Sequence, residues 1–202
     1  MSPSLKITHI GTATAILEIN GINMLTDPLF SSAGHEDHVD NLDDLGRQLL
    51  DGRLVFTTTD GAKNLSPRPG VHGLKPWEKL HISIAGKEFT VIGTPSKHAI
   101  GGECSGFIIT ADEFGCGRDG LPNAISSPGT RYLTSPRYHI TMDGKQAAKL
   151  FRDIKADYLA PMHYESWHHF TQFGENLHQV FREEGIHEQV CWLEPGRPVT
   201  VL

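Results

Sequence analysis

The sequence predicts an α/β fold in which β-sheets are covered by helices on their outer faces. Strand and hairpin patterns dominate the first part of the chain, and strand and helix patterns alternate in the last part. Helices placed outside the sheets would bury both faces of the strands. With 202 residues, the chain is long enough to bury a real core and is expected to form a single domain, residues 1–202.

The chain opens with three strand patterns, at residues 5–10, 13–18 and 22–26. The second and third are separated by Asn20-Gly21, which is a strong signal for a hairpin because a type I′ turn needs positive φ at both central positions. Asp27-Pro28 is expected to end the third strand.

The middle of the chain predicts a helix, a strand and a second hairpin. Four leucines share one face of the expected helix: Leu42, Leu45, Leu49 and Leu50. Gly52 stands where the C-cap of that helix would lie. A strand at 54–58 and a helical turn at 60–64 follow. Two further strand patterns flank a turn at Gly86, at residues 80–85 and 88–94.

The last part of the chain predicts four more strands, at residues 106–111, 123–127, 158–160 and 190–193. Two amphipathic helices alternate with them, at residues 141–155 and 171–184. In the first of these helices, a capping residue comes first, and Leu150, Phe151 and Ile154 lie on one side.

Charge and composition narrow the class of partner. The formal net charge is −6, and lysine and arginine do not cluster, which argues against a nucleic-acid surface. The composition leaves a small-molecule substrate open. It does not exclude a phosphate-containing substrate, because a bound metal would supply its own positive charge. The sequence does not indicate the oligomeric state.

The cysteines and the apolar runs predict a cytoplasmic protein. Cys104, Cys116 and Cys191 show no CxxC spacing, and an odd number of cysteines fits a reducing compartment better than a disulfide framework. No signal-peptide pattern and no apolar run of transmembrane length is present in the sequence.

Histidines and carboxylates form the strongest candidate site. The segment 35–40 (His-Glu-Asp-His-Val-Asp) places two imidazoles and three carboxylates within six residues, and His98 and His163 stand alone downstream, each after a short apolar run. Neutral imidazole and carboxylate are the ligands that zinc, manganese and iron prefer. The alternative interpretation of the segment is a solvated acidic loop in which Asp40 or Asn41 caps the next helix. His98 and His163 could likewise be loop histidines with ordinary hydrogen bonds.

Four stretches carry a resemblance to a known family. They are Thr8–Thr14 with Leu25–Pro28, the loop 35–41, the strand end Thr94–His98, and the strand end Pro161–Tyr164. In this order they resemble the metallo-β-lactamase superfamily, and most of all its branch of ascorbate-phosphate lactonases and N-acylphosphatidylethanolamine-hydrolysing phospholipase D enzymes.

The resemblance implies a four-layer αββα sandwich with one or two divalent metal ions at the edge between two sheets. Zinc is the first expectation, and manganese or iron would also suit the ligands. It implies a hydrolase of an ester, lactone or phosphodiester that uses a metal-bound hydroxide.

The same resemblance assigns roles to individual residues. His35, His38 and His98 would bind mainly the first metal, and His163 would bind the second. Asp40 or Asp37 would bind the second metal or orient the attacking water. Asp27 would not bind a metal itself but would orient one of the metal-binding side chains.

The chain also departs from the family pattern. The family loop has three histidines, but the spacing here is shifted by one residue, so that no register restores them all. The family's Gly-Asp-Thr turn, which bridges the metals, corresponds to residues 127–130 (Ser-Pro-Gly-Thr), which contain no carboxylate. The segment between Phe30 and His35 is too short for the family's buried strand, and a further strand is missing near residues 134–136.

These departures leave two alternatives to an active hydrolase. The first is a catalytically impaired homologue that binds a ligand or a single metal without efficient turnover. The second is a shortened chain that folds poorly alone, because a missing strand would expose sheet edges.

Overall fold

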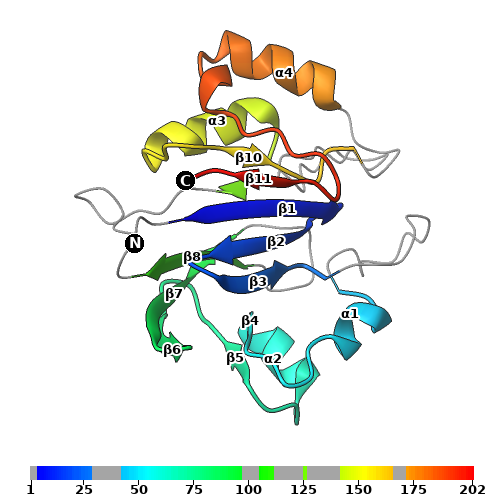
Figure 1. Ribbon diagram of the computed structural model, residues 1–202, viewed down its shortest axis with the longest axis vertical. Coiled ribbons are helices and arrows are strands. Elements are labelled where there is room, and N and C mark those ends of the chain that lie inside the picture. The colour runs from blue at the N-terminus through cyan, green and yellow to red at the C-terminus, as the bar shows by residue number, and fades with distance from the viewer. Residues whose placement is uncertain (1–3, 29–41, 97–104, 112–124, 127–141, 166–171) are drawn as a thin grey trace. The chain divides into compact units, whose positions relative to one another are not determined.

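A computed structural model of the chain describes residues 4–28, 42–96, 105–111, 125–126, 142–165 and 172–202 (Figure 1). The chain forms two compact units, Met1–Gly46 with Asn123–Leu202 and Arg47–Pro122. Each unit combines strands with helices, in agreement with the predicted α/β class. The single domain stays a prediction.

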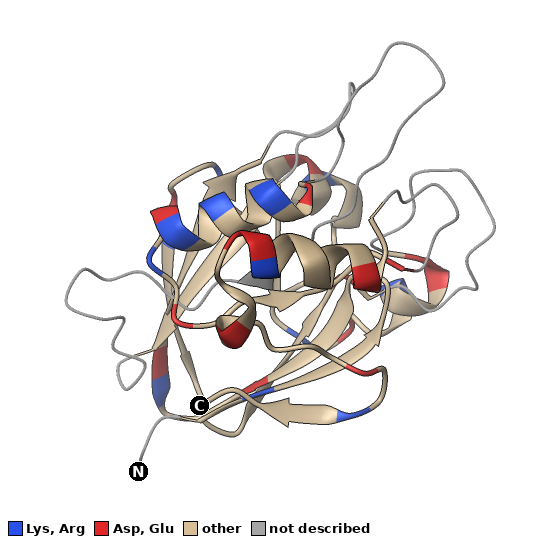
Figure 2. Ribbon diagram, turned by 90° about the horizontal axis from the view of Figure 1, so that it is seen from above, with Lys and Arg blue, Asp and Glu red and all other residues tan. Residues whose placement is uncertain are grey.

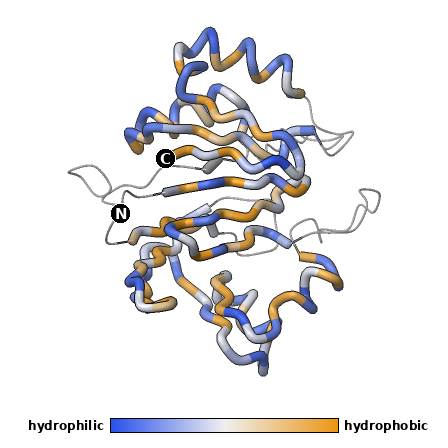
Figure 3. The backbone as a smooth tube through the Cα atoms, in the orientation of Figure 1, coloured by the Kyte–Doolittle hydropathy of each residue, from blue (hydrophilic) through white to orange (hydrophobic). Residues whose placement is uncertain are grey.

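The first unit contains a four-stranded antiparallel sheet in the order β11-β1-β2-β3. Its strands are β1 (Leu5–Gly11), β2 (Thr14–Ile19), β3 (Ile22–Thr26) and β11 (Pro198–Thr200). Apolar and polar residues follow one another along these strands (Figure 3), so that Leu5 and Ile7 of β1 are buried while Lys6 is exposed. The three predicted N-terminal strands are confirmed.

The predicted turn between β2 and β3 is also confirmed. Asn20 and Gly21 have φ values of 50° and 80°, the two positive values that a type I′ turn needs. The Asn20 side-chain oxygen accepts a hydrogen bond from the backbone nitrogen of Ser4 at 3.0 Å. The turn is therefore tied to the beginning of β1.

A second part of the first unit is built from short strands and helices. The strands β9 (Ile125–Ser126) and β10 (Ala160–Pro161) pair in parallel. The helices are α3 (Gly144–Asp153), α4 (Gly174–Glu183) and the 3₁₀ turn η1 (His187–Gln189). Helix α1 (Asp44–Gln48) crosses from the first unit into the second.

Helices α3 and α4 bury their apolar sides in a common core. Its fully or almost fully buried members are Ala147, Ala148, Phe151, Leu159, Leu177, Phe181 and Ile186. Burial of large side chains such as Phe181 supplies the main stabilising free energy of such a cluster. The two amphipathic helices predicted from the sequence are thereby confirmed.

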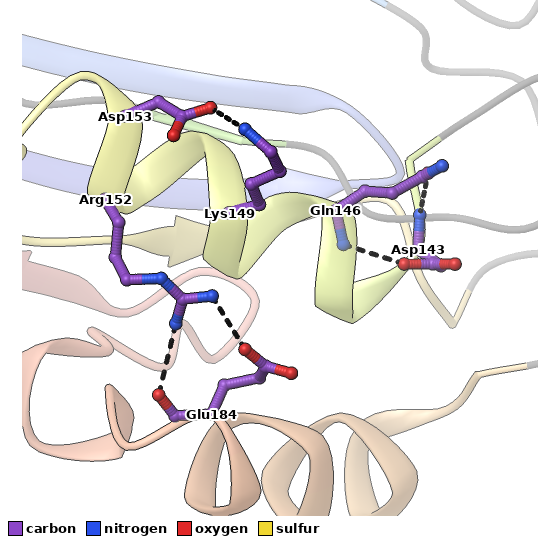
Figure 4. A network of polar contacts seen from close by, with 6 residues as sticks. All are labelled: Asp143, Gln146, Lys149, Arg152, Asp153 and Glu184. Atoms are coloured by element: carbon purple, nitrogen blue, oxygen red, sulfur yellow. Dashed lines mark hydrogen bonds and ion pairs between the residues drawn. The ribbon is translucent and has the colours of Figure 1, made fainter.

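Helix α3 begins with a capping box (Figure 4). The Asp143 carboxylate accepts a hydrogen bond from the backbone nitrogen of Gln146 at 2.8 Å, and the Gln146 side-chain oxygen accepts one from the backbone nitrogen of Asp143 at 3.0 Å. These two bonds satisfy backbone donors that the first turn of a helix otherwise leaves open.

Helices α3 and α4 carry both basic and acidic side chains (Figure 2). Lys149 pairs with Asp153 along α3, and Arg152 donates to the Glu184 carboxylate at 2.7 Å (Figure 4). These pairs are largely exposed to solvent, so each contributes only about 0.2–1 kcal/mol.

The second unit contains two smaller sheets. In one, β4 (Val55–Thr57) and β5 (Val71–Gly73) are parallel, and helix α2 (Thr59–Leu65) lies between them in sequence. In the other, β6 (Lys79–Ile84), β7 (Lys87–Pro95) and β8 (Ser105–Ala111) form an antiparallel meander. Phe89 and Val91 of β7 are buried. The predicted hairpin around Gly86 is confirmed by the antiparallel pairing of β6 with β7, and Gly86 in its turn has a φ of 75°.

Several sequence predictions were incomplete. The leucine-rich helix is confined to α1, and Leu45 is 51% exposed, so the expected apolar face is not buried as a whole. Residues 190–193 form a single parallel bridge, from Val190 to Leu159, rather than a strand. Strands β5 and β11 were not predicted, because each has only three residues and depends on a partner distant in sequence.

Among the described residues, no helix combines the length and the apolar character that a membrane crossing requires.

Candidate functional site

His163 is the predicted metal ligand whose position the structure describes. It follows β10 by two residues, after the buried Met162. Its φ is 63°, in the left-handed region that few non-glycine residues adopt. The Nε2 atom of its ring is buried. A turn of unusual backbone conformation therefore places an imidazole nitrogen at the end of a strand, out of contact with bulk water.

Strand β9, the neighbour of β10, ends at the same edge of their sheet. Strands β9 and β10 run parallel, with Ser126 opposite Pro161. The carboxyl ends of parallel strands meet at one edge, which is where such folds bind their ligands. Strand β9 therefore ends at the edge where His163 stands, directly before residues 127–130 of the sequence, which contain no carboxylate.

Two contacts hold the turn that follows His163. The ring of Tyr164 meets that of Trp192 edge to face, with centroids 6.1 Å apart. The Glu165 carboxylate accepts a hydrogen bond from the backbone nitrogen of Gly174, the first residue of α4, at 3.1 Å. One contact ties the turn to the aromatic core, and the other ties it to a helix.

The pKa values of two nearby side chains, Tyr164 and Cys191, are raised. Burial, and then the negative charge of Glu165, raise the pKa of the Tyr164 hydroxyl above its usual value. Burial also raises the pKa of the Cys191 thiol. Both groups are therefore neutral at physiological pH, and the Cys191 thiol is a poor nucleophile.

The segment with the predicted metal loop has a fixed point at each end. A Cβ atom added to Gly46 would lie 1.9 Å from the carbonyl oxygen of Pro28, so these two backbones are in direct contact. The Asp43 carboxylate accepts a hydrogen bond from the Gly46 nitrogen at 2.7 Å. The buried Thr14 hydroxyl donates to the Asp27 carbonyl at 2.6 Å. Pro28 and Gly46, which lie on either side of residues 35–40 in the sequence, are therefore in contact.

In the second unit, the strand end that leads to His98 is fixed in a similar way. Pro95 pairs with Ser105 at the end of the β7–β8 ladder. Beyond this pair, the Ser96 hydroxyl oxygen accepts a hydrogen bond from the Gly106 nitrogen at 3.1 Å. The connection between β7 and β8 therefore starts and ends at adjacent positions.

The remaining predicted site residues lie outside the described residues: His35, Asp37, His38, Asp40 and His98. Within the described part of the chain, no three histidine, cysteine, aspartate or glutamate side chains are grouped as metal ligands. The buried imidazole nitrogen of His163 suits a divalent cation of borderline softness, such as zinc. The ligand set as a whole stays a prediction.

Sequence reasoning missed the contacts made by the two residues that follow His163. Glu165 and Gly174 are nine positions apart, and no local pattern links a carboxylate to a glycine at that distance. Trp192 is farther still from Tyr164 along the chain. No pattern in the sequence near His163 points to these contacts.

Comparison with known proteins supports the fold. No model of a known protein family matches the chain. The chain is 26% identical to a UPF0173 metal-dependent hydrolase of Methanopyrus kandleri over 227 aligned positions, which cover 95% of this chain and 98% of that protein. These positions outnumber the 202 residues of this chain, so the relative carries at least 25 residues that have no counterpart here. A longer relative agrees with the prediction that internal segments are missing from this chain.

Two solved structures resemble the chain along nearly its whole length. One is Igni18, a metallo hydrolase from Ignicoccus hospitalis, with a TM-score of 0.71, 20% identity, and coverage of 98% of both chains. The other is the metallo-β-lactamase fold protein YhfI from Bacillus subtilis, with a TM-score of 0.60, 17% identity, and coverage of 98% of this chain and 99% of that one. The predicted metallo-β-lactamase type of fold is therefore confirmed.

Proposed function

We propose that the chain is a metal-dependent hydrolase of the metallo-β-lactamase superfamily that acts on a small-molecule ester, lactone or phosphodiester. The observation that carries this proposal is His163, whose imidazole nitrogen is buried at the end of β10 in a left-handed turn. A relative that is named a metal-dependent hydrolase and aligns with 95% of the chain supports it.

The residues of the chain would act as ligands and as positioning groups. When bound, one or two divalent cations lower the pKa of water to about 7 and polarise the bond to be cleaved. His163 would hold one cation. His35, His38 and His98 would hold the other, and Asp40 or Asp37 would hold a cation or orient the attacking water. These carboxylates are the candidate proton acceptors.

Zinc is the proposed metal, because imidazole nitrogens dominate the ligand set and the Nε2 atom of the one described ligand is buried. Manganese or iron would suit the carboxylates as well. We also propose that the chain is related to the branch of ascorbate-phosphate lactonases and N-acylphosphatidylethanolamine-hydrolysing phospholipase D enzymes, because four motifs of the sequence resemble that branch.

Metal content tests the proposal directly. The chain is purified without chelator, and its zinc, manganese and iron are measured by plasma mass spectrometry. About one or two equivalents are expected in the wild type and a clear loss in His163→Ala. His187→Ala is the matched control, because His187 is exposed on η1 and pairs with Glu188. Metal below about a tenth of an equivalent in the wild type would refute the proposal.

One observation favours a second candidate, a homologue with impaired catalysis. Strand β9 ends at the edge where His163 stands, and the next four residues in the sequence, 127–130, contain no carboxylate. Such a site could hold a single cation, which would not stabilise the leaving group as a pair does. Steady turnover of a generic phosphodiester or lactone that disappears in His163→Ala would exclude this candidate.

A further inference from the structure

We infer that Glu165 is a positioning residue for His163: its hydrogen bond to the first residue of α4 fixes the turn that carries the metal-binding imidazole. The inference rests on the proposed function, in which His163 is a ligand. It assigns to Glu165 neither contact with the metal nor contact with the substrate.

The first step is that the turn needs support. His163 has a φ of 63°, a conformation that side chains with a Cβ atom adopt at a cost in free energy. Such a conformation persists only where the surroundings hold it. The residue before it, Met162, is buried, so support on that side comes from the core. On the other side, Tyr164 and Glu165 make contacts that can hold the turn.

The second step is that helix α4, whose first residue donates the hydrogen bond to Glu165, is held in place by its buried side chains. Glu165 accepts its hydrogen bond from Gly174, where α4 begins. Leu177 and Phe181 of this helix are fully buried in the core of the first unit. A hydrogen bond to the first turn of α4 therefore connects the turn at His163 to a helix that is anchored in the core of the unit.

The third step is that Gly174 makes room for this bond. A Cβ atom at position 174 would lie 2.6 Å from Oε1 of Glu165, closer than non-bonded atoms approach. Alanine at this position would therefore push the carboxylate away from the Gly174 nitrogen. Since alanine favours a helix more than glycine does, it would not weaken α4 itself.

Together these contacts orient the imidazole before a cation arrives. A ligand that is already ordered loses less conformational entropy on binding, so its affinity is higher. Loss of groups that orient a metal-binding histidine typically weakens metal affinity about 10- to 100-fold. A loss near the lower end is expected for Glu165, because Tyr164 still packs on Trp192.

The test measures zinc affinity by competition with a chromophoric chelator. Glu165→Ala and Gly174→Ala are each expected to weaken zinc binding about 10-fold. Glu165→Gln should stay near the wild-type affinity, because an amide oxygen accepts the same hydrogen bond. Glu183→Ala is the matched control, since Glu183 is an exposed carboxylate on the same helix that pairs with Gln179.

Two further measurements separate positioning from general stability. The thermal midpoint of the metal-free variants should stay near that of the wild type, and Gly174→Ala should not lower it. In the double variant, Glu165→Ala and Gly174→Ala should together weaken binding no more than either alone, because both remove one interaction.

The outcomes also distinguish this inference from the proposed function. Unchanged zinc affinity in Glu165→Ala, with binding lost in His163→Ala, would overturn the positioning role and leave the hydrolase proposal standing. A parallel fall of affinity and thermal midpoint in Glu165→Ala, with normal affinity in Gly174→Ala, would also overturn it. A wild type that binds no divalent metal would refute both.

Discussion

Tyr164 and Trp192 meet edge to face, with ring centroids 6.1 Å apart, directly beside the candidate ligand His163. Trp192 also stacks on His178 of α4, with ring centroids 3.6 Å apart. An indole is thus placed between the turn after β10 and the helix that anchors it. Because aromatic pairs have a preferred geometry, a change in the turn should alter the surroundings of this indole.

Trp192 should therefore report metal binding by its fluorescence. In a Trp77→Phe, Trp167→Phe background, titration with zinc is expected to change the emission of Trp192 in a saturable way, because ligation restricts the neighbouring turn. The same titration of His163→Ala, in the same background, serves as the control. Equal emission changes in the two proteins would show that Trp192 does not sense a cation at His163.

Phe181→Ala should destabilise the first unit strongly. The side chain is fully buried between α3 and α4, and its loss is expected to lower the free energy of unfolding by about 3–5 kcal/mol. Gln179→Ala, on the exposed side of the same helix, should change it by less than about 0.5 kcal/mol. Urea unfolding followed by circular dichroism measures both, and similar midpoints would contradict the assignment of this core.

Removal of the capping box of α3 should have a smaller effect. Asp143→Ala removes the acceptor for the Gln146 nitrogen and should cost about 1 kcal/mol of unfolding free energy. Asp143→Asn keeps a side-chain oxygen in place and should retain most of that stability. Chemical denaturation of both variants, with Lys145→Ala as control, checks the ranking; equal losses in Asn and Ala would argue against a capping role.

Gly46→Ala should disturb the base of the predicted metal loop. The new Cβ would overlap the Pro28 carbonyl, and relieving that overlap is expected to cost about 1–3 kcal/mol or more. Gly11→Ala is the matched control, because nothing lies within 4 Å of a Cβ at that position. Thermal unfolding compares the two, and a Gly46→Ala protein as stable as Gly11→Ala would mean that Pro28 and Gly46 are not in contact.

The free energy of unfolding should fall at alkaline pH partly through Cys191. Burial raises the pKa of its thiol, so the folded chain holds this proton more tightly than the unfolded chain, where the ordinary value of 9.0 applies. The resulting stabilisation is complete below about pH 9 and is lost as pH rises through the raised pKa. Cys191→Ala should flatten this decline in urea unfolding at pH 8 and pH 10, and an unchanged slope would contradict it.

The elements that the sequence predicted well are those with a local physical cause. The Asn20-Gly21 turn follows from the positive φ that both residues accept, and α3 follows from its cap and the period of its apolar residues. The β6–β7 hairpin follows from alternation around Gly86. In each case, neighbouring residues along the chain contain the information that determines the structure.

The elements that the sequence did not predict depend on distant partners. Strand β11 exists because Val199 pairs with Ile7 from the opposite end of the chain, and β5 exists because Val71 pairs with Val55. Residues 190–193 show the opposite effect, since an apolar run that looks like a strand finds only one bridge partner, at Leu159. Pairing over long separations is a property of the fold and not of a local pattern.

The candidate site divides in the same way. The sequence by itself determined that His163 stands at the end of a short strand and that imidazoles and carboxylates suited to a divalent cation occur in a known order. Tertiary structure alone decided the backbone and the contacts of this turn: the left-handed conformation of His163, the packing of Tyr164 on Trp192, and the hydrogen bond that Glu165 accepts from the first residue of α4. The reason is physical, since ligand chemistry belongs to individual side chains, whereas the orientation of a ligand is set by contacts between segments that only folding brings together.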